Sequence, residues 1–261
     1  MSFLTIDSVN NEKIKYAVKL ASSAKYRREC GAFFLEGLRL CRDAAESEAD
    51  IRTLFFTEDA YEKYTHDIEM IAGKAEKSYV VSSACADKLS ETKTSQGVFL
   101  ICGFPPFTKE DEIDPNGKYI ALEKIQDPSN LGAICRTAEA LGIDGAVLCG
   151  CCDVFNPKAQ RSAMGSLLRL KIIKTEELSS LLLKLKAQSM AILATTPDSR
   201  AKSVTETDMT GGVIAVIGNE GNGVSREILE LCAPVTIPMK GRAESLNASM
   251  AAALVMWEMM R

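Results

Sequence analysis

Polar side chains and glycines gather in three loops of the second half of the chain, each between a predicted strand and a predicted helix. In a parallel α/β sheet, ligands bind at such loops, where strands end. In the first loop, 126–138, Asn130 can cap the helix and Arg136 follows about one and a half turns later. Apolar and small neighbours surround Arg136, so its guanidinium needs a phosphate or carboxylate partner. A structural ion pair would also serve, and its candidate acids are Asp127, Glu139 and Glu220.

The second loop, 217–225, carries three glycines after an apolar strand and before a helix, at positions 218, 221 and 223. Their spacing is not that of the dinucleotide fingerprint Gly-x-Gly-x-x-Gly, and no Gly-Lys-Ser/Thr follows as in a phosphate-binding P-loop. This disfavours a nicotinamide-dependent oxidoreductase. We interpret the glycines as allowing the backbone to approach a flat ligand closely, although a tight turn would explain them too.

The third stretch, 237–261, is a polar loop followed by a helix that has no charged residue between Asn247 and Trp257. Ser245 and Asn247 are both good helix N-caps. A helix without a polar face should be buried, either inside its domain or against a partner.

Composition excludes several classes of protein. The chain has 261 residues, of which 46% are hydrophobic and 25% charged, as in soluble globular proteins. No apolar run reaches the ~18 residues of a membrane span, and the N-terminus does not resemble a signal peptide. We therefore expect a cytoplasmic protein without membrane contact. Nine cysteines fit that compartment, and Cys149-Gly-Cys-Cys152 lacks a second cysteine pair, so we expect no metal site.

The net charge of −4 conceals a basic segment. Between Lys13 and Arg42 the sequence has eight lysines and arginines but only two acids, Glu29 and Glu36. Such a patch can face the phosphates of a nucleic acid, and a solvated helix face would explain it as well.

Strands and helices alternate along both halves, which predicts an α/β fold with two domains. In the first half we expect helices over 11–28, 38–48, 59–73 and 82–89, and strands over 31–37, 51–57, 78–81 and 97–102. In the second half we expect strands over 118–122, 145–149, 168–173, 190–195, 212–217 and 235–239, and helices over 131–141, 158–164, 176–188, 225–231 and the C-terminal residues. Prolines, glycines and acids mark a linker, so the domains are 1–103 and 118–261 with 104–117 between them.

Taken together and in this order, 130–142, 217–224 and 237–249 closely resemble the three motifs of the SpoU/TrmH family of RNA ribose methyltransferases. Residues 156–165 resemble a further stretch of that family, and the likeness covers 118–261. The first part, with Phe33-Phe-Leu-Glu-Gly37, resembles the substrate-binding domain of many members, which is similar to ribosomal proteins that bind RNA.

The resemblance implies an enzyme that binds S-adenosylmethionine and methylates a ribose 2′-hydroxyl in RNA, with ribosomal RNA favoured over transfer RNA. It implies a parallel-sheet SPOUT domain with a deep trefoil knot, a smaller N-terminal α/β RNA-binding domain, and a homodimer formed through the C-terminal domain. A transfer-RNA methyltransferase and a non-catalytic RNA-binding assembly factor stay open as alternatives. The target nucleotide and any role in antibiotic resistance are not specified by the sequence.

The resemblance also assigns residues. The catalytic candidates are Arg136, Asn130, Glu220, Ser245 and Asn247. The cofactor-binding candidates are Thr195, Thr196, Gly218, Asn219, Gly221, Ile237, Met239, Ser245 and Leu246. The RNA-binding candidates are Lys13, Lys15, Lys25, Arg27, Arg28 and Arg39. Whether Arg136 helps to deprotonate the hydroxyl or stabilises the developing alkoxide stays open, because a free guanidinium has a pKa above ~12.

Overall fold

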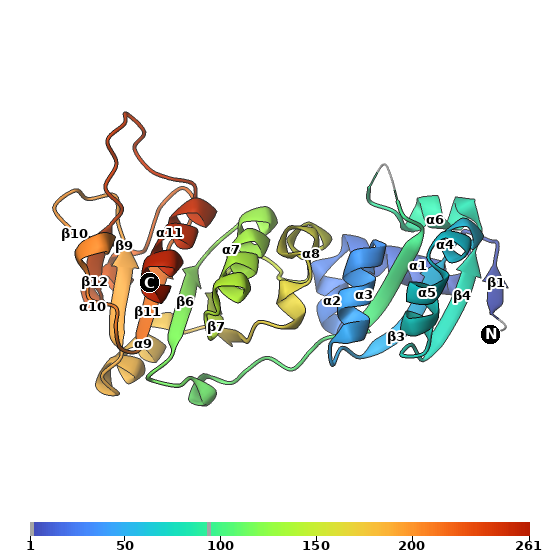
Figure 1. The fold of residues 1–261 in the computed structure, drawn as a ribbon, viewed down its shortest axis with the longest axis horizontal. Coiled ribbons are helices and arrows are strands. Elements are labelled where there is room, and N and C mark those ends of the chain that lie inside the picture. The colour runs from blue at the N-terminus through green and yellow to red at the C-terminus, as the bar shows by residue number, and fades with distance from the viewer. Residues whose placement is uncertain (1–2, 93–94) are drawn as a thin grey trace. The chain divides into compact units, whose positions relative to one another are not determined.

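The computed structural model describes residues 3–92 and 95–261, and it divides into two compact units. One comprises Met1–Pro106 with Phe155–Leu168, and the other comprises Phe107–Val154 with Arg169–Arg261. Residues 155–168 thus pack with the first unit, although the sequence places them in the second domain. An α/β fold with a parallel sheet is confirmed (Figure 1).

The first unit is built on a five-stranded sheet in the order β1-β4-β3-β5-β2, in which β5 runs antiparallel to both of its neighbours. Its strands are β1 (Leu4–Ile6), β2 (Ala32–Glu36), β3 (Ile51–Phe56), β4 (Lys77–Val81) and β5 (Val98–Gly103). Its helices are α1 (Glu12–Ser22), α2 (Ala24–Cys30), α3 (Leu38–Glu46), α4 (Glu58–Lys63), α5 (Thr65–Ala72), α6 (Ser83–Leu89) and α8 (Pro157–Ala163), with a 3₁₀ turn at Ser166–Leu168. The short strand β1 is absent from the sequence-based prediction.

An aromatic stack explains why residues 155–168 belong to the first unit. The ring of Phe155 stacks on Phe33 at 4.6 Å and on Phe104 at 4.3 Å between centroids. Phe33 and Phe155 are buried. Burial of such rings contributes about 2–3 kcal/mol each, which holds this returning segment on strand β2.

The helix expected over 11–28 is two helices, because Ser23 interrupts it. Ser23 has an extended backbone (φ −125°), and its hydroxyl accepts a hydrogen bond from the Tyr26 amide at 3.2 Å. Serine competes well as an N-cap and therefore starts a new helix here. The helix expected over 59–73 is likewise split, at Tyr64.

Arg27 faces inward from α2 and is only 2% exposed. Its guanidinium donates to the carbonyl oxygens of Leu20 and Ala21, which lie in the last turn of α1. The last carbonyls of a helix have no partner within the helix, so Arg27 satisfies them. Its assignment to an RNA-binding surface is therefore wrong, because the side chain is committed to the core.

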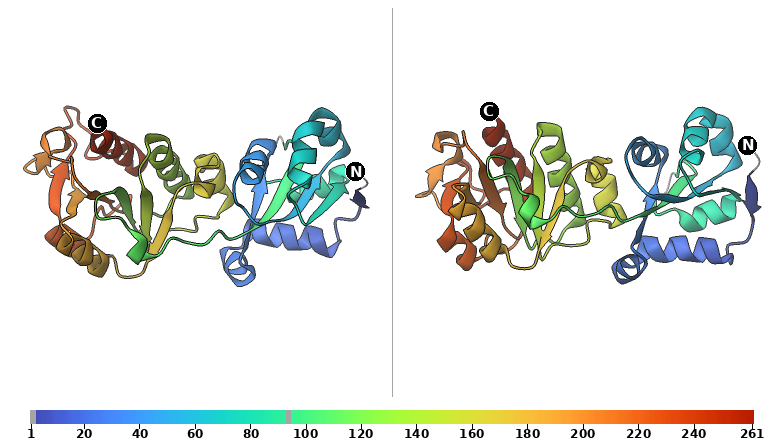
Figure 2. Two further views of the ribbon diagram at one scale, coloured as in Figure 1. Left: turned by 60° about the horizontal axis from the view of Figure 1, so that its bottom comes forward. Right: turned by 90° about the horizontal axis from the view of Figure 1, so that it is seen from below.

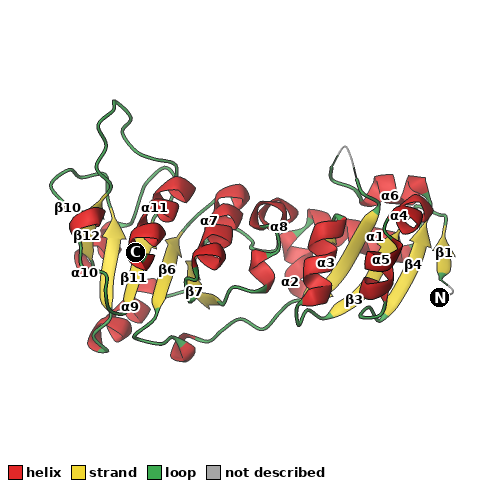
Figure 3. Ribbon diagram, viewed as in Figure 1, coloured by secondary structure: helices red, strands yellow, loops and turns green. Residues whose placement is uncertain are grey.

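The second unit contains a seven-stranded sheet in the order β10-β12-β9-β11-β6-β7-β8, and every pair in it is parallel (Figure 3). Its strands are β6 (Lys118–Glu123), β7 (Gly145–Cys149), β8 (Ile172–Thr175), β9 (Ala191–Thr195), β10 (Lys202–Ser203), β11 (Val213–Ile217) and β12 (Ala233–Thr236). Its helices are α7 (Pro128–Leu141), α9 (Leu178–Ala187), α10 (Arg226–Leu231) and α11 (Ala248–Met260), with 3₁₀ turns at Glu110–Glu112 and Val204–Glu206.

Helices cover both faces of this sheet, which is why strands such as β11 are apolar throughout and fully buried. Leu178, Leu181 and Ile228 of α9 and α10 pack on one face. Helices α7 and α11 pack against each other and against the sheet on the other face (Figure 2). Among the described residues, no helix is long and apolar enough to span a membrane.

Two expected strands in the second unit differ from the observed ones by more than one residue at an end, and one observed strand was not expected. The strand expected over 168–173 is β8, which begins at Ile172 because residues 166–168 form a 3₁₀ turn. The strand expected over 235–239 is β12, which ends at Thr236. Strand β10 is not predicted from the sequence, since two residues carry no periodicity.

Substituting Arg27 tests its structural role. Arg27→Ala leaves two buried carbonyl oxygens without their donor, so we expect roughly 2–4 kcal/mol less stability and a Tm about 10 °C lower. Thermal unfolding followed by circular dichroism measures the change. Arg28→Ala, one residue along on the exposed face, is the matched control and should leave Tm within about 2 °C. Equal effects of the two substitutions would contradict a buried role for Arg27.

Candidate active site

The three sequence motifs meet at the carboxyl edge of the parallel sheet. The loop after β6 carries the first motif, the loop after β11 the second, and the loop after β12 the third. All three strands run in the same direction, so their loops emerge on one side. Hydrogen bonds between side chains and backbone then join the loops into one structure.

Glu220 accepts hydrogen bonds from three N–H donors of the first motif. Its Oε2 accepts from the Gln126 amide at 3.1 Å. Its Oε1 accepts from the Asp127 amide at 3.0 Å and from the Asn130 side chain at 3.1 Å. A carboxylate is a strong acceptor, so this single side chain ties the second motif to the N-terminus of α7.

These donors favour the charged form of Glu220. Burial raises the pKa of its carboxyl, but the hydrogen bonds from Asn130, Asp127 and Gln126 outweigh burial and lower it below its ordinary value. A lowered pKa means that the contribution of Glu220 to stability is complete above the ordinary pKa of a glutamate. That contribution is lost only as the pH falls through the lowered value.

Asn130 carries the connection on to the third motif. Its Oδ1 accepts a hydrogen bond from the Asn247 side chain at 3.1 Å. The Oδ1 of Asn247 in turn accepts from the amide of Ser249 at 2.9 Å and from its hydroxyl at 2.6 Å, which caps α11. Glu220, Asn130 and Asn247 therefore form one relay across the three motifs. The candidate Ser245 lies outside this relay.

The glycine-rich loop is a closed turn around Asn219. Its amide and carbonyl pair with those of Gly223 at 3.0 and 2.8 Å, and its Oδ1 accepts from the amides of Gly221 and Asn222 at 3.0 Å each. A Cβ on Gly218 would lie 2.0 Å from the carbonyl carbon of Gly223. Glycine is required at 218 because the two ends of the turn touch.

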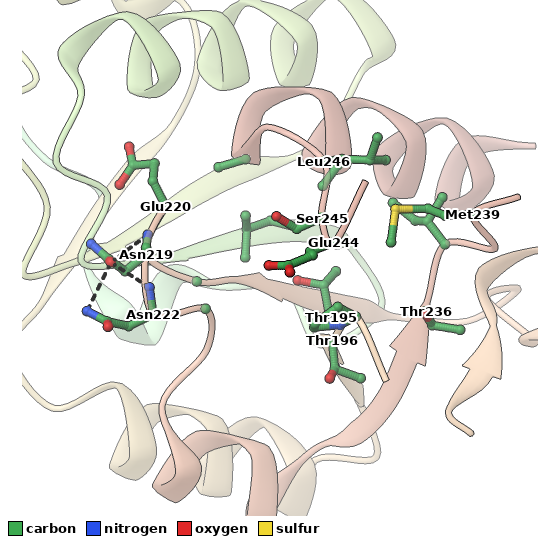
Figure 4. Close-up of a pocket in the computed structure, with 18 residues that line it drawn as sticks. Thr195, Thr196, Asn219, Glu220, Asn222, Thr236, Met239, Glu244, Ser245 and Leu246 are labelled. Atoms are coloured by element: carbon green, nitrogen blue, oxygen red, sulfur yellow. Dashed lines mark hydrogen bonds between the residues drawn. The ribbon is translucent and has the colours of Figure 1, made fainter. Parts of the chain in front are cut away.

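A pocket of about 320 Å³ lies between the loops after β9, β11 and β12 (Figure 4). That volume is in the range of small-molecule sites. All nine cofactor-binding candidates line it: Thr195, Thr196, Gly218, Asn219, Gly221, Ile237, Met239, Ser245 and Leu246. Sequence reasoning missed further lining residues, which are Pro197, Ile217, Asn222, Gly223, Thr236, Glu244, Ala248 and Ala251. Most are neighbours of residues that were found, and adjacency is the signal that could have identified them.

The sequence suggests apolar surroundings for Arg136. In the structure its side chain is instead exposed on α7. The alternative, an ion pair with Glu139, is not formed, and Glu139 instead pairs with Arg169 at 2.9 Å. Within residues 3–92 and 95–261, Arg136 makes no hydrogen bond or ion pair. Its guanidinium is therefore available to an anion outside the chain.

The pKa values of four cysteines near this edge are raised, which favours the thiol over the thiolate. Burial, more than any charge, raises the pKa of Cys135 and Cys152 to about 12 and that of Cys151 to about 11. The pKa of Cys149 is also raised by burial. In the described part of the chain, no group of three histidines, cysteines or acids is placed to hold a metal ion.

The RNA-binding candidates other than Arg27 lie at the surface of the first unit. Lys13, Lys15, Lys25, Arg28 and Arg39 are exposed. Lys15 pairs with Glu12 at 2.8 Å and Lys25 with Glu29 at 3.8 Å. Exposed pairs of this kind contribute at most about 1 kcal/mol, so a phosphate can compete for these lysines.

Asn130→Asp tests the relay, because it replaces the donor that faces Glu220 with a second carboxylate. Two carboxylates in contact repel, which raises the pKa of one of them. We expect roughly 2–3 kcal/mol less stability at pH 8 and a smaller loss at pH 5, where protonation restores a donor. Thermal unfolding across this pH range gives the measurement. Asn130→Ala removes the donor without adding charge and should show a loss that does not vary with pH; the same flat profile for Asn130→Asp would refute the relay.

Comparisons with known proteins agree with this geometry. Residues 117–257 match the SpoU rRNA Methylase family, and residues 11–100 match the MRM3-like substrate binding domain. The chain is 30% identical over 256 residues to RlmP of Bacillus subtilis (strain 168), a 23S rRNA (guanosine(2553)-2'-O)-methyltransferase, covering 97% of this chain and 98% of that protein. It is 26% identical to a 23S rRNA (uridine(2479)-2'-O)-methyltransferase of Streptomyces viridochromogenes, covering 96% of this chain and 90% of that protein.

Among solved structures, an AdoMet-bound rRNA methyltransferase from Sinorhizobium meliloti matches with a TM-score of 0.85 and 26% identity, covering 98% of this chain and 96% of that one. The likeness extends over both units, and the family model spans all three motif loops. The chain therefore belongs to the SpoU rRNA methylase family, a family of RNA methyltransferases, as its motifs predict.

Proposed function

We propose that this protein binds S-adenosylmethionine in the pocket beside the relay and transfers its methyl group to a ribose 2′-hydroxyl of ribosomal RNA. The observation that carries the proposal is the relay from Glu220 through Asn130 to Asn247, which assembles all three motifs beside a pocket of cofactor size. The names of the two 23S rRNA methyltransferases support RNA ribose as the substrate, and the AdoMet-bound structure supports the cofactor.

The residues suit this chemistry. S-adenosylmethionine supplies a methyl group that its sulfonium already activates. The protein must align a 2′-hydroxyl with that group and accommodate the charge that develops on oxygen as its proton leaves. Arg136 is exposed and unpaired among the described residues, so its guanidinium can bind an RNA phosphate and stabilise the developing alkoxide. The high pKa of an arginine favours this role over that of a free base.

RNA binding is assigned to the first unit in this proposal. The support is its match to a substrate-binding domain and its exposed cations Lys13, Lys15, Lys25, Arg28 and Arg39. Lys13 also lies over the ring of Tyr79, 5.5 Å from its centroid, which orients the ammonium group. Phosphate contacts of this kind position an RNA without reading its bases.

A trefoil knot is part of the proposal for the second unit. Its support is the family resemblance together with the path of the third motif. Strand β12 lies beside β9, whereas the following helix α11 packs against α7, β11 and β6. The chain between Ile237 and Asn247 must therefore cross from one part of the sheet to another. We propose that it passes through a loop as it does so.

A homodimer formed through α11 accounts for an exposed apolar stripe on that helix. Met250, Leu254 and Trp257 lie three or four residues apart and are 57%, 45% and 59% exposed. Three large apolar side chains on one helix face favour a protein interface. A second copy of the chain presents the same stripe and can bury it in a two-fold contact.

A cytoplasmic location completes the proposal. All nine cysteines are free thiols. Free thiols persist in the reducing compartment where RNA is made and modified.

Arg136→Ala tests the chemistry. Removing the guanidinium should lower methyl transfer to RNA by at least about 100-fold, because a charge-stabilising donor is lost, while cofactor affinity stays within about twofold. Transfer of a radiolabelled methyl group measures the first quantity and calorimetry the second. Arg169→Ala is the matched control, since that arginine is held by Glu139. Full activity of Arg136→Ala would remove Arg136 from the mechanism.

Trp257→Glu tests the dimer. A carboxylate at position 257 of the apolar stripe cannot be buried against a second copy without a large desolvation cost. We expect monomers in light scattering at micromolar concentration, with the wild type dimeric. Leu183→Glu, on α9 at a side chain that is 51% exposed, is the control and should leave the dimer intact. A dimeric Trp257→Glu variant would place the interface elsewhere.

A further inference from the structure

Two glutamates line the pocket, and only one of them has no hydrogen-bond or ion-pair partner among the described residues. Glu220 and Glu244 line it, and none of the described lining residues is a lysine or arginine. Glu220 is committed to three N–H donors of the first motif. Glu244 makes no hydrogen bond or ion pair with any described residue, although Lys240 and Arg242 lie in the same loop. Its negative charge is therefore available to a ligand in the pocket.

The position of Glu244 suits contact with such a ligand. It precedes Ser245 in the third motif, three residues before Asn247, which the relay anchors to Asn130. Figure 4 shows its carboxylate among the lining side chains, beside Ser245 and Thr195. Thr195 is itself held in place, since its hydroxyl donates to the carbonyl oxygen of Val216 at 3.1 Å.

The charge of the ligand changes during the proposed reaction. The bond between sulfur and the methyl carbon breaks, its electron pair stays on sulfur, and the methyl carbon bonds to the ribose oxygen while the hydroxyl proton passes to water. The cationic sulfonium thereby becomes a neutral thioether. A free carboxylate in the pocket attracts the sulfonium form and has no such attraction for the thioether.

We propose that Glu244 makes this pocket prefer charged S-adenosylmethionine over the neutral thioether product, S-adenosylhomocysteine. This assignment rests on the proposed function, because it takes the pocket as the cofactor site. Glu244 acts as a specificity-determining residue: it stabilises the cofactor before transfer and favours release of the product afterwards.

The test measures the dissociation constants of S-adenosylmethionine and S-adenosylhomocysteine by titration calorimetry, with the full-length protein. Glu244→Gln keeps the shape of the side chain but removes its charge, so its affinity for S-adenosylmethionine should fall about tenfold while that for S-adenosylhomocysteine stays within about twofold. A tenfold change corresponds to about 1.4 kcal/mol. Glu227→Gln, an exposed glutamate on α10 outside the pocket, is the control and should change neither constant.

Glu244→Asp separates charge from shape. It keeps the carboxylate, so it should retain the preference for the charged ligand even if both affinities fall. Equal weakening of both ligands in Glu244→Gln, or no weakening of either, would overturn the assignment. A wild-type protein that binds neither ligand would instead refute the proposed function of the pocket, and that outcome is distinct from the other two.

Discussion

The structure of this site depends on one carboxylate that accepts hydrogen bonds from several N–H groups of another loop. Glu220 lies in a loop of glycines that has little side-chain packing of its own, yet it accepts from Gln126, Asp127 and Asn130 across the edge of the sheet. Charge-assisted hydrogen bonds are stronger than neutral ones, and three on one group outweigh the cost of its partial burial. Because Asn130 also accepts from Asn247, the same carboxylate indirectly positions the start of the last helix.

The parallel sheet makes this arrangement available. With every strand pair parallel, the loops after β6, β9, β11 and β12 emerge on one side, so segments distant in sequence meet there. The two helical layers bury the strands on both faces and leave that edge as the place where polar backbone is accessible. Glycine at 218 lets the turn after β11 close beside the pocket, since a Cβ there would collide with the backbone of Gly223.

Charged residues in this protein differ in whether they are committed to the fold. Arg27 satisfies carbonyl oxygens inside the first unit, whereas Arg28, one residue later, is at the surface. Glu220 is held by three donors, whereas Glu244 lines the same pocket without a partner among the described residues. Arg136 belongs to the uncommitted group. Uncommitted charges are the ones that can meet a ligand, because binding them breaks no interaction that the fold needs.

The sequence by itself determined the fold class, the family and nine of the residues that line the pocket, because strand periodicity and motif order can be read along the chain. It missed the break in helix 11–28, where Ser23 caps α2 and Arg27 donates to carbonyl oxygens of α1. It also misplaced what depends on contacts between residues that are distant in the sequence. Residues 155–168 join the first unit because Phe155 stacks on Phe33 and Phe104. Only the tertiary structure decided that Glu220 is held by hydrogen bonds, whereas Arg136 and Glu244 have no partner among the described residues. The partners of a side chain depend on which loops meet, and no local pattern in the sequence encodes that.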